Sequence, residues 1–331
     1  MLKKIVICLA LLGLLLAVPS SACSSFMQTN SQGTFVGRTM EWWGPLKTRI
    51  AIFPRGLEMK DPFGPISWKM KYGAVVMEDE GACAEGVNEK GLTAHLLYQS
   101  DSQMPELKPG KPEISTINWI KYALGNYGSV KEVVSGLKDY QLKMVAIPYQ
   151  GKKVKVPCHF SVNDETGDAA IIEFNGGKLQ VFHSPKCNVM TNEPDYPAQL
   201  ANLAKIQKAQ KLYSIENLPG GALPANRFVR LSFNLAHLLD PKTPEEAVAY
   251  MEQVIATVLV PAYDDKKHKI SPDSDAWNAR WHVVYDLKRM NMFFDQDETG
   301  KKLYLKLKDI DFTGKEIKYL ELKNCKSVYD L

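Results

Sequence analysis

Cys23, in the stretch SSACSSFMQTN, is the residue whose type and position most directly indicate chemistry. A thiolate is a strong nucleophile, and it can form a covalent intermediate with a carbonyl substrate when a base accepts the thiol proton. The same residue could instead pack in the core, form half of a disulfide, carry a lipid, or become the first residue of a processed chain. The residues before Cys23 favour the last of these roles.

Residues 1–22 have the pattern of a secretory signal peptide. Two lysines are followed by an apolar run over residues 5–18 and then by small side chains. The run has fourteen residues, fewer than the roughly 20 that a membrane-spanning helix needs. Signal peptidases prefer small residues one and three places before the cut, and Ala22 and Ser20 supply both. We therefore expect a mature chain, exported to the periplasm or secreted, that begins at Cys23.

The alternative is a lipoprotein signal, in which the sulfur of Cys23 would be diacylated and the protein would bind a ligand at the membrane surface. Such signals normally carry Leu or a similar residue at the position of Ser20. Without this lipid we expect no membrane association, because no second long apolar run follows the leader.

A nucleophile at the very N-terminus needs no histidine, because its own α-amine, with an ordinary pKa of about 7.7–8.0, can accept the thiol proton. The six histidines show no spacing typical of metal ligands, and we expect each to be structural. A Cys-His dyad with His95 or His159 would lack any local motif of a thiol protease. We therefore expect no metal and no organic cofactor. The remaining histidines are His183, His237, His268 and His282.

The composition excludes several other classes of protein. Loss of the two lysines of the leader leaves 39 basic residues (41 minus 2) against 37 acidic ones, a net charge of about +2. Because these charges are interleaved, nothing indicates nucleic-acid binding. The mature chain has no Cys-x-x-Cys pair, and spacing does not decide whether its other thiols pair or stay free. These are Cys83, Cys158, Cys187 and Cys325.

The order of expected elements favours one α+β domain over residues 23–331. Apolar pieces separated by TNSQG predict a hairpin over residues 25–52, and CHFSV, AAIIEF and LQVFH predict a three-stranded meander. Further strands are expected near 281–287 and 301–308. Capping boxes begin at Ser129 and Thr243, and a third helix is expected over 198–212. Strands that follow one another without alternating helices indicate antiparallel sheets.

Several motifs, taken together, resemble the choloylglycine hydrolase family, also called the linear amide C–N hydrolases, within the N-terminal nucleophile superfamily. Each motif is weak alone, but their order and spacing span most of the mature chain. They are Cys23 after the leader, GRTMEWW at 37–43, GVNEKGLTAHLLY at 86–98, VMTNEP at 189–194 and NRFVR at 226–230.

The resemblance implies a four-layer αββα sandwich of two antiparallel sheets. It also implies that Cys23 is the nucleophile, that its α-amine is the base, and that Arg38 lies beside the thiol. Glu41 stands where most members have the aspartate that binds the α-amine, so it keeps the carboxylate but adds a methylene. Alternatively, Arg38 and Glu41 would be no more than a charged pair on the surface of a strand.

The resemblance further implies that the side-chain amide of Asn192 and the backbone N–H of Tyr98 stabilise the oxyanion, and that Arg227 is a second active-site arginine. Asn88 corresponds to a family position that is structural rather than catalytic. Considered only by residue type, Tyr98 could be an ordinary strand aromatic, Asn192 a turn residue, and Arg227 part of an amphipathic segment.

The implied reaction is hydrolysis of a small-molecule N-acyl amide. A tyrosine at position 98 favours a penicillin V acylase-like activity, with conjugated bile salts or N-acyl homoserine lactones as alternative substrates. Trp42 and Trp43 could line an acyl pocket or pack in the core. Relatives often form homotetramers, so the resemblance admits the same assembly here.

Overall fold

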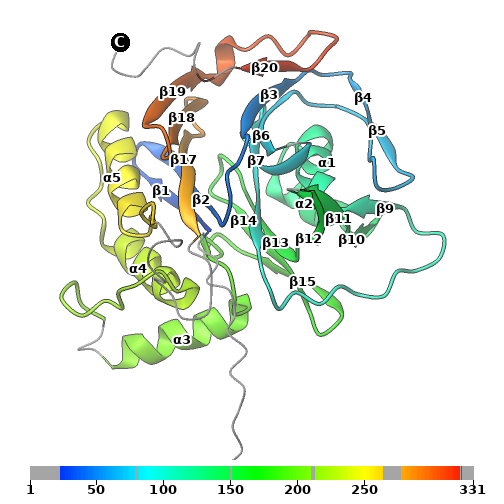
Figure 1. Ribbon diagram of the computed structural model, residues 1–331. Coiled ribbons are helices and arrows are strands. Elements are labelled where there is room, and N and C mark those ends of the chain that lie inside the picture. Colours follow the sequence, from blue (N-terminus) through cyan, green and yellow to red (C-terminus); the bar gives the residue numbers. More distant parts are fainter. Residues whose placement is uncertain are drawn as a thin grey trace, which may run out of the picture.

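The computed structural model describes residues 23–79, 81–149, 151–209, 213–263, 277–320 and 322. Two large β-sheets lie face to face, and helices cover the outer face of each sheet (Figure 1). The predicted four-layer αββα arrangement is therefore confirmed. The expected leader at 1–22, His268 and Cys325 lie outside the described residues.

The first sheet holds the N-terminal hairpin at its centre. All its neighbouring strands pair antiparallel. Its order is β16 (Val189–Met190), β1 (Ser24–Asn30), β2 (Gly33–Trp42), β17 (Asn278–Asp286), β18 (Asn291–Gln296) and β19 (Lys301–Lys306).

The second sheet has eight strands and is antiparallel throughout. Its order is β15 (Lys178–His183), β14 (Ala169–Asn175), β13 (Cys158–Asn163), β8 (Thr93–Tyr98), β7 (Ala82–Asn88), β6 (Ala74–Asp79), β3 (Arg49–Phe53) and β20 (Lys318–Leu320).

Three small two-stranded sheets lie beside the second sheet (Figure 1). They consist of β4 (Glu58–Lys60) with β5 (Ser67–Lys69), β9 (Glu113–Ser115) with β10 (Gln141–Lys143), and β11 (Ala146–Tyr149) with β12 (Lys152–Lys155).

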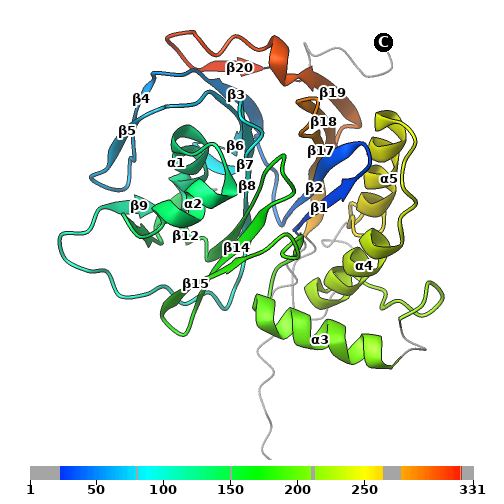
Figure 2. The ribbon, with the colours of Figure 1, turned by 180° about the vertical axis from the view of Figure 1, so that it is seen from behind.

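Helices α3 (Tyr196–Lys208), α4 (Pro224–His237) and α5 (Pro244–Ala256) cover the first sheet, while α1 (Trp119–Asn126) and α2 (Val130–Gly136) cover the second (Figure 2). The two predicted N-caps are confirmed. The hydroxyl of Ser129 accepts from the backbone N–H of Glu132, and that of Thr243 accepts from Glu246. Among the described residues, no helix is long and apolar enough to span a membrane.

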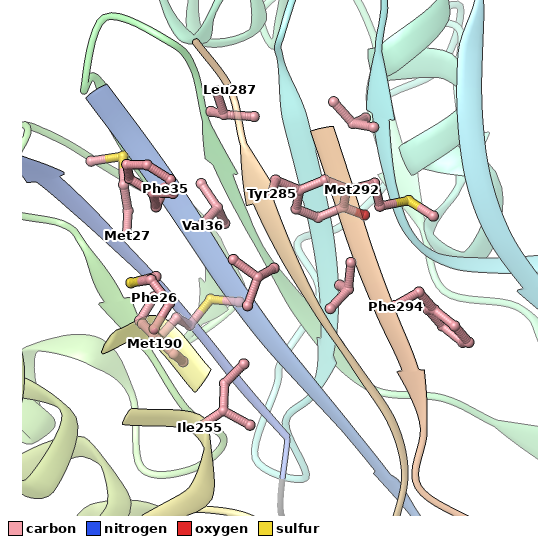
Figure 3. Packing of buried hydrophobic residues seen from close by; sticks show 14 of the residues in the cluster. Phe26, Met27, Phe35, Val36, Met190, Ile255, Tyr285, Leu287, Met292 and Phe294 are labelled. Atoms are coloured by element: carbon pink, nitrogen blue, oxygen red, sulfur yellow. The ribbon is translucent and has the colours of Figure 1, made fainter. Parts of the chain in front are cut away.

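The largest apolar cluster surrounds the central strands of the first sheet (Figure 3). Phe26 of β1, Val36 of β2 and Tyr285 of β17 are almost fully buried within it. The aromatic ring of Phe26 lies directly against Gly37, where an added Cβ would come within 2.4 Å of the ring. Close packing of this kind fixes the hairpin between the two layers that cover it.

The strand predictions are largely confirmed. The hairpin is β1 and β2, the meander is β13 to β15, and the turn at Gly176 and Gly177 has positive φ at both residues. One irregularity was not predicted: β17 bulges at Arg280, where Glu41 pairs with Ala279 but Met40 pairs with Trp281. The Nη2 and the Nε of Arg280 donate to the Trp42 carbonyl oxygen at 2.8 and 3.0 Å. These bonds connect β17 and β2 at the bulge.

Candidate active site

Cys23 lies immediately before β1 and is buried, with only 2% of its surface exposed. Its Sγ lies 3.6 Å from the backbone oxygen of Glu41 and 3.8 Å from the Sδ of Met40. The thiol is therefore held against the last residues of β2, the strand that pairs with β1.

The four described cysteines, Cys23 included, are all free and buried. Burial raises the pKa of the Cys83 thiol and of the Cys158 thiol to about 12, and it also raises the pKa of Cys187. A thiol with so high a pKa is a poor nucleophile at neutral pH. These three thiols are therefore poor candidates, and the position of Cys23 directly before β1 and against the end of β2 makes it the candidate nucleophile among the described residues.

Arg227, from α4, connects the candidate site residues. Its Nη1 donates to the backbone oxygen of Cys23 at 2.6 Å and to the hydroxyl of Ser24 at 2.7 Å. Its Nη2 donates to the Oδ1 of Asn192 at 2.8 Å, and its Nε donates to the Ala222 carbonyl oxygen. Burial lowers the pKa of Arg227 to about 10, while the nearby Glu41 opposes this shift. The guanidinium therefore stays charged at neutral pH.

Asn192 is fixed from both ends of its amide. While Oδ1 accepts from Arg227, Nδ2 donates to the backbone oxygen of Tyr98 at 2.7 Å. Since an amide nitrogen carries two hydrogens, one N–H remains for a further acceptor. The side chain of Tyr98 packs edge-on against Trp277, so this strand aromatic also contributes to the packing beside the site.

Arg38 is fully buried between the two sheets. Its Nη2 donates to the Leu96 carbonyl oxygen at 2.9 Å and lies 3.7 Å from the Sδ of Met40, and its Nη1 donates to the Thr39 carbonyl oxygen. Its Nε lies 3.5 Å from the carboxylate of Glu85. Met40 thus contacts both the thiol of Cys23 and the guanidinium of Arg38.

Glu41 is fully buried, so the alternative of a surface pair with Arg38 is wrong. Burial raises the pKa of the Glu41 carboxyl to about 8, against the opposing effects of Arg227, Arg38 and a hydrogen bond from Thr39. Its Oε2 accepts that hydrogen bond, while Oε1 has no partner among the described residues. One oxygen is therefore fixed and the other is left to accept from a further donor.

A cavity of about 310 Å³ begins at Met40, the side chain in contact with the Cys23 sulfur. Most of the lining is apolar, and Trp42 on its wall stacks on Trp43 with ring centroids 3.9 Å apart. Trp42 therefore has both of the roles that the sequence suggested: it packs with neighbouring aromatic residues and it lines a cavity. Other lining residues include Leu46, Phe63, Leu96, Ile147, Tyr149 and Trp281.

Sequence reasoning missed Thr39, Met40 and Ser24 as parts of this site. Only the cross-strand register of β1, β2 and β17 brings them together, and that register is not visible in a single strand. A usable signal was present for Thr39 and Met40, since both lie inside the GRTMEWW motif. Asn88, in contrast, binds four backbone groups and has the structural role expected of it.

His282 of β17 lies among carboxylates close to this site. Its Nε2 is 3.0 Å from Glu252, and its Nδ1 is 2.9 Å from Asp297. Burial alone would lower the His282 pKa, but hydrogen bonds to Asp295, Asp297 and Glu252 raise it to about 11. Lys302 also pairs with Asp295. The Glu252, His282 and Asp295 ligand atoms are close enough to hold a metal ion, but His282 and Lys302 already pair with these carboxylates.

Two antiparallel sheets between helical layers, with a cysteine at the start of a central strand, define the N-terminal nucleophile hydrolase fold. The family model for linear amide C-N hydrolases of the choloylglycine hydrolase family matches residues 23–318. The chain therefore belongs to this family, and it is an amidohydrolase that acts on linear amides.

The penicillin V acylase of Pectobacterium atrosepticum is 30% identical over 336 aligned positions, which cover 94% of this chain and 88% of that protein. The structure of penicillin V acylase from Agrobacterium tumefaciens superposes with a TM-score of 0.79 at 29% identity, covering 90% of this chain and 91% of that one. A variant of the conjugated bile acid hydrolase from Clostridium perfringens has the same fold, with a TM-score of 0.74 at 22% identity, covering 90% and 97% of the two chains.

Proposed function

We propose that the mature enzyme begins at Cys23 and hydrolyses an N-acyl amide in the manner of a penicillin V acylase, with Cys23 as the nucleophile. The observation that carries this proposal is the set of hydrogen bonds from one guanidinium. Arg227 reaches both the backbone of Cys23 and the side chain of Asn192, so it ties the position of the nucleophile to that of an oxyanion donor.

In the first stage, the α-amine of Cys23 accepts the thiol proton, and the sulfur attacks the amide carbonyl carbon. The negative charge that develops on the carbonyl oxygen is stabilised by the free N–H of Asn192 and the backbone N–H of Tyr98. Collapse of this intermediate breaks the C–N bond. The protonated α-amine donates its proton to the departing nitrogen, and the acyl group remains on sulfur as a thioester.

In the second stage, water attacks the thioester and the α-amine accepts one of the water protons. The acid leaves, and the thiol is restored when the amine returns the proton to sulfur. Glu41 has the role of an acceptor for the α-amine, supported by its buried and unpartnered Oε1. Met40 places the guanidinium of Arg38 near the thiol, because its Sδ contacts both groups.

The acyl group occupies the cavity that starts at Met40. A mostly apolar lining with Trp42, Phe63 and Tyr149 suits an aromatic or fatty acyl group, because burial of such a group removes apolar surface from water. Phenoxyacetyl amides such as penicillin V fit this chemistry and match the substrate named for the relative from Pectobacterium atrosepticum. Conjugated bile salts and N-acyl homoserine lactones are the alternatives that a substrate panel must separate.

We also propose that residues 1–22 are removed during export to the periplasm or the cell exterior. The match to the family model starts at residue 23, which supports a processed chain with Cys23 first. The burial of the Cys23 thiol against Met40 and Glu41 argues against a diacylglyceryl group on that sulfur, and so against a lipid-anchored binding protein.

The test is mass spectrometry of the exported chain together with hydrolysis assays. We expect an unmodified N-terminal Cys23, release of the amine from penicillin V, and loss of activity on treatment with iodoacetamide and in Cys23→Ala. A thioether-linked lipid, a different first residue, or hydrolysis that survives alkylation would each overturn the assigned nucleophile. Glycocholate and an N-acyl homoserine lactone, assayed in parallel, decide among the substrate classes.

A further inference from the structure

Thr39 lies at the centre of the candidate site without belonging to the groups assigned above. It pairs with Ser24 of β1 on one side and with His282 of β17 on the other, and its surface is fully buried. Thr39 is therefore flanked by β1, which follows the nucleophile, and by β17, which carries His282.

Thr39 binds its two neighbours in the GRTMEWW motif through different atoms. Its hydroxyl donates to the Oε2 of Glu41 at 3.1 Å, and its backbone oxygen accepts from the Nη1 of Arg38. Because residues two apart on a strand point to the same face, the hydroxyl and the Glu41 carboxylate share one side of β2. Arg38 and Met40 lie on the opposite side, toward the second sheet.

The hydroxyl matters because Glu41 has one more rotatable bond than an aspartate at this position would have. A side chain with an additional torsion must be held by its surroundings if its free oxygen is to stay in one place. Of the two carboxylate oxygens, Oε2 is bound by Thr39, whereas Oε1 is buried and has no partner among the described residues. The clamp on Oε2 thereby sets where Oε1 points.

The charged groups that face Glu41 come from several elements. The charges of Arg227, on α4, and of Arg38, on β2, both favour the carboxylate. Asp297, which follows β18, opposes ionisation. Thr39 is the neutral donor in this set, so its removal leaves the formal charges of the site unchanged. This separates its contribution from that of the arginines.

From this geometry we propose that Thr39 is a positioning residue for the reaction, which clamps Oε2 of Glu41 so that Oε1 meets the α-amine of Cys23. The inference rests on the proposed function, in which that amine is the base. Thr39 itself touches neither the substrate nor the reacting atoms. It acts through Glu41, and it allows the longer side chain to place its carboxylate where that of an aspartate would lie.

The test compares Thr39→Val, Thr39→Ser and Thr34→Val in the processed enzyme with penicillin V as substrate. Thr34 is the matched control, since it is a buried threonine of the same strand whose hydroxyl donates to the backbone oxygen of Glu165. Loss of a hydrogen bond to a charged group changes an equilibrium by about tenfold or more. We expect Thr39→Val to lower kcat/KM at pH 7 about tenfold and to move the acid limb of its pH profile upward by about one unit.

The direction of this shift follows from the charges. Without the hydroxyl, Glu41 ionises at higher pH, so the carboxylate that accepts from the α-amine is present only at higher pH. Thr39→Ser restores the donor, and we expect its profile to overlay that of the unmodified enzyme. In a Glu41→Gln background, Thr39→Val causes no further loss, because the two residues act through the same contact.

A uniform loss of rate in Thr39→Val, with an unshifted pH profile and no rescue by Thr39→Ser, would show a merely structural role and overturn the proposal. The pH dependence of Cys23 alkylation by iodoacetamide provides a readout that needs no amide substrate. If the enzyme hydrolyses no amide, the proposed function fails. The role of Thr39 fails separately if the alkylation profiles of Thr39→Val and Thr34→Val coincide.

Discussion

The Nη2 of Arg227 donates to the Oδ1 of Asn192 at 2.8 Å and thereby fixes which end of the amide is the donor. An asparagine amide can be turned by half a rotation with little change in shape, so only its partners decide where its nitrogen lies. With Oδ1 held by the guanidinium, Nδ2 must face the backbone oxygen of Tyr98. An arginine on α4 thus sets the polarity of an oxyanion donor that lies in a loop after β16.

Asn192→Ala removes that donor and tests its role. Loss of one oxyanion donor typically costs about 10²–10³ in kcat with a much smaller change in KM. We expect a loss of this size in steady-state assays with penicillin V. Asn188→Ala is the matched control. Asn188 lies on the same segment as Asn192, but its Nδ2 donates to the Met27 carbonyl oxygen. Near-normal turnover in Asn192→Ala would remove Asn192 from the oxyanion site.

Arg227→Lys keeps a positive charge but cannot reproduce the fork of the guanidinium. Arg227 donates to at least four groups on three segments, and a single ammonium cannot reach all of them in the same geometry. We expect kcat to fall by about 10² with penicillin V, as when an oxyanion donor is lost. Arg230→Lys, one turn further along α4 at a more exposed position, is expected to retain normal turnover. Equal effects of the two changes would refute a specific role for Arg227.

Glu41→Gln is expected to change how stability depends on pH. The pKa of Glu41 is raised from 4.5 to about 8, so between these values the native state binds more protons than the unfolded state. The contribution of Glu41 to the free energy of unfolding is complete below pH 4.5 and declines as the pH rises toward 8. Urea titrations at pH 5 and pH 8 should therefore show a decline for the unmodified chain that is smaller in Glu41→Gln. Equal declines in both chains would contradict the raised pKa.

Trp42→Ala is expected to weaken binding of large apolar acyl groups. Trp42 lines the cavity and is packed against Trp43, Tyr149 and Trp277. Removing so large an aromatic surface should raise KM for penicillin V about tenfold, with kcat less affected. An N-acetyl amide of the same amine is the control substrate, because its acyl group is too small to reach the cavity wall. If KM rises equally for both substrates, Trp42 acts on the fold rather than on the acyl group.

Local patterns predicted much of the fold. The β1–β2 hairpin follows from TNSQG between two apolar runs, and the helix starts at Ser129 and Thr243 follow from side chains that cap the backbone nearby. The αββα layering came from the resemblance to a family rather than from these patterns. In the structure the motif that begins at Gly37 lies almost entirely in β2, and the motif that begins at Gly86 spans the end of β7 and all of β8.

The site was predictable only in part. The resemblance named Cys23, Asn192 and Arg227, and the structure joins them by hydrogen bonds, while their catalytic roles stay predictions. The packing of Trp42 against Trp277 was not predictable, because the two residues lie 235 positions apart. The bulge at Arg280 likewise depends on pairing between distant strands.

Alternation along β2 separates two tasks on a single strand. Met40 and Trp42 face the cavity, while Thr39 and Glu41 face Arg227. A substitution of Trp42 can therefore change which acyl group the cavity admits while the contact between Thr39 and Glu41 stays in place. Members of a family with this arrangement can differ in the acyl group that they accept and still keep the same reaction.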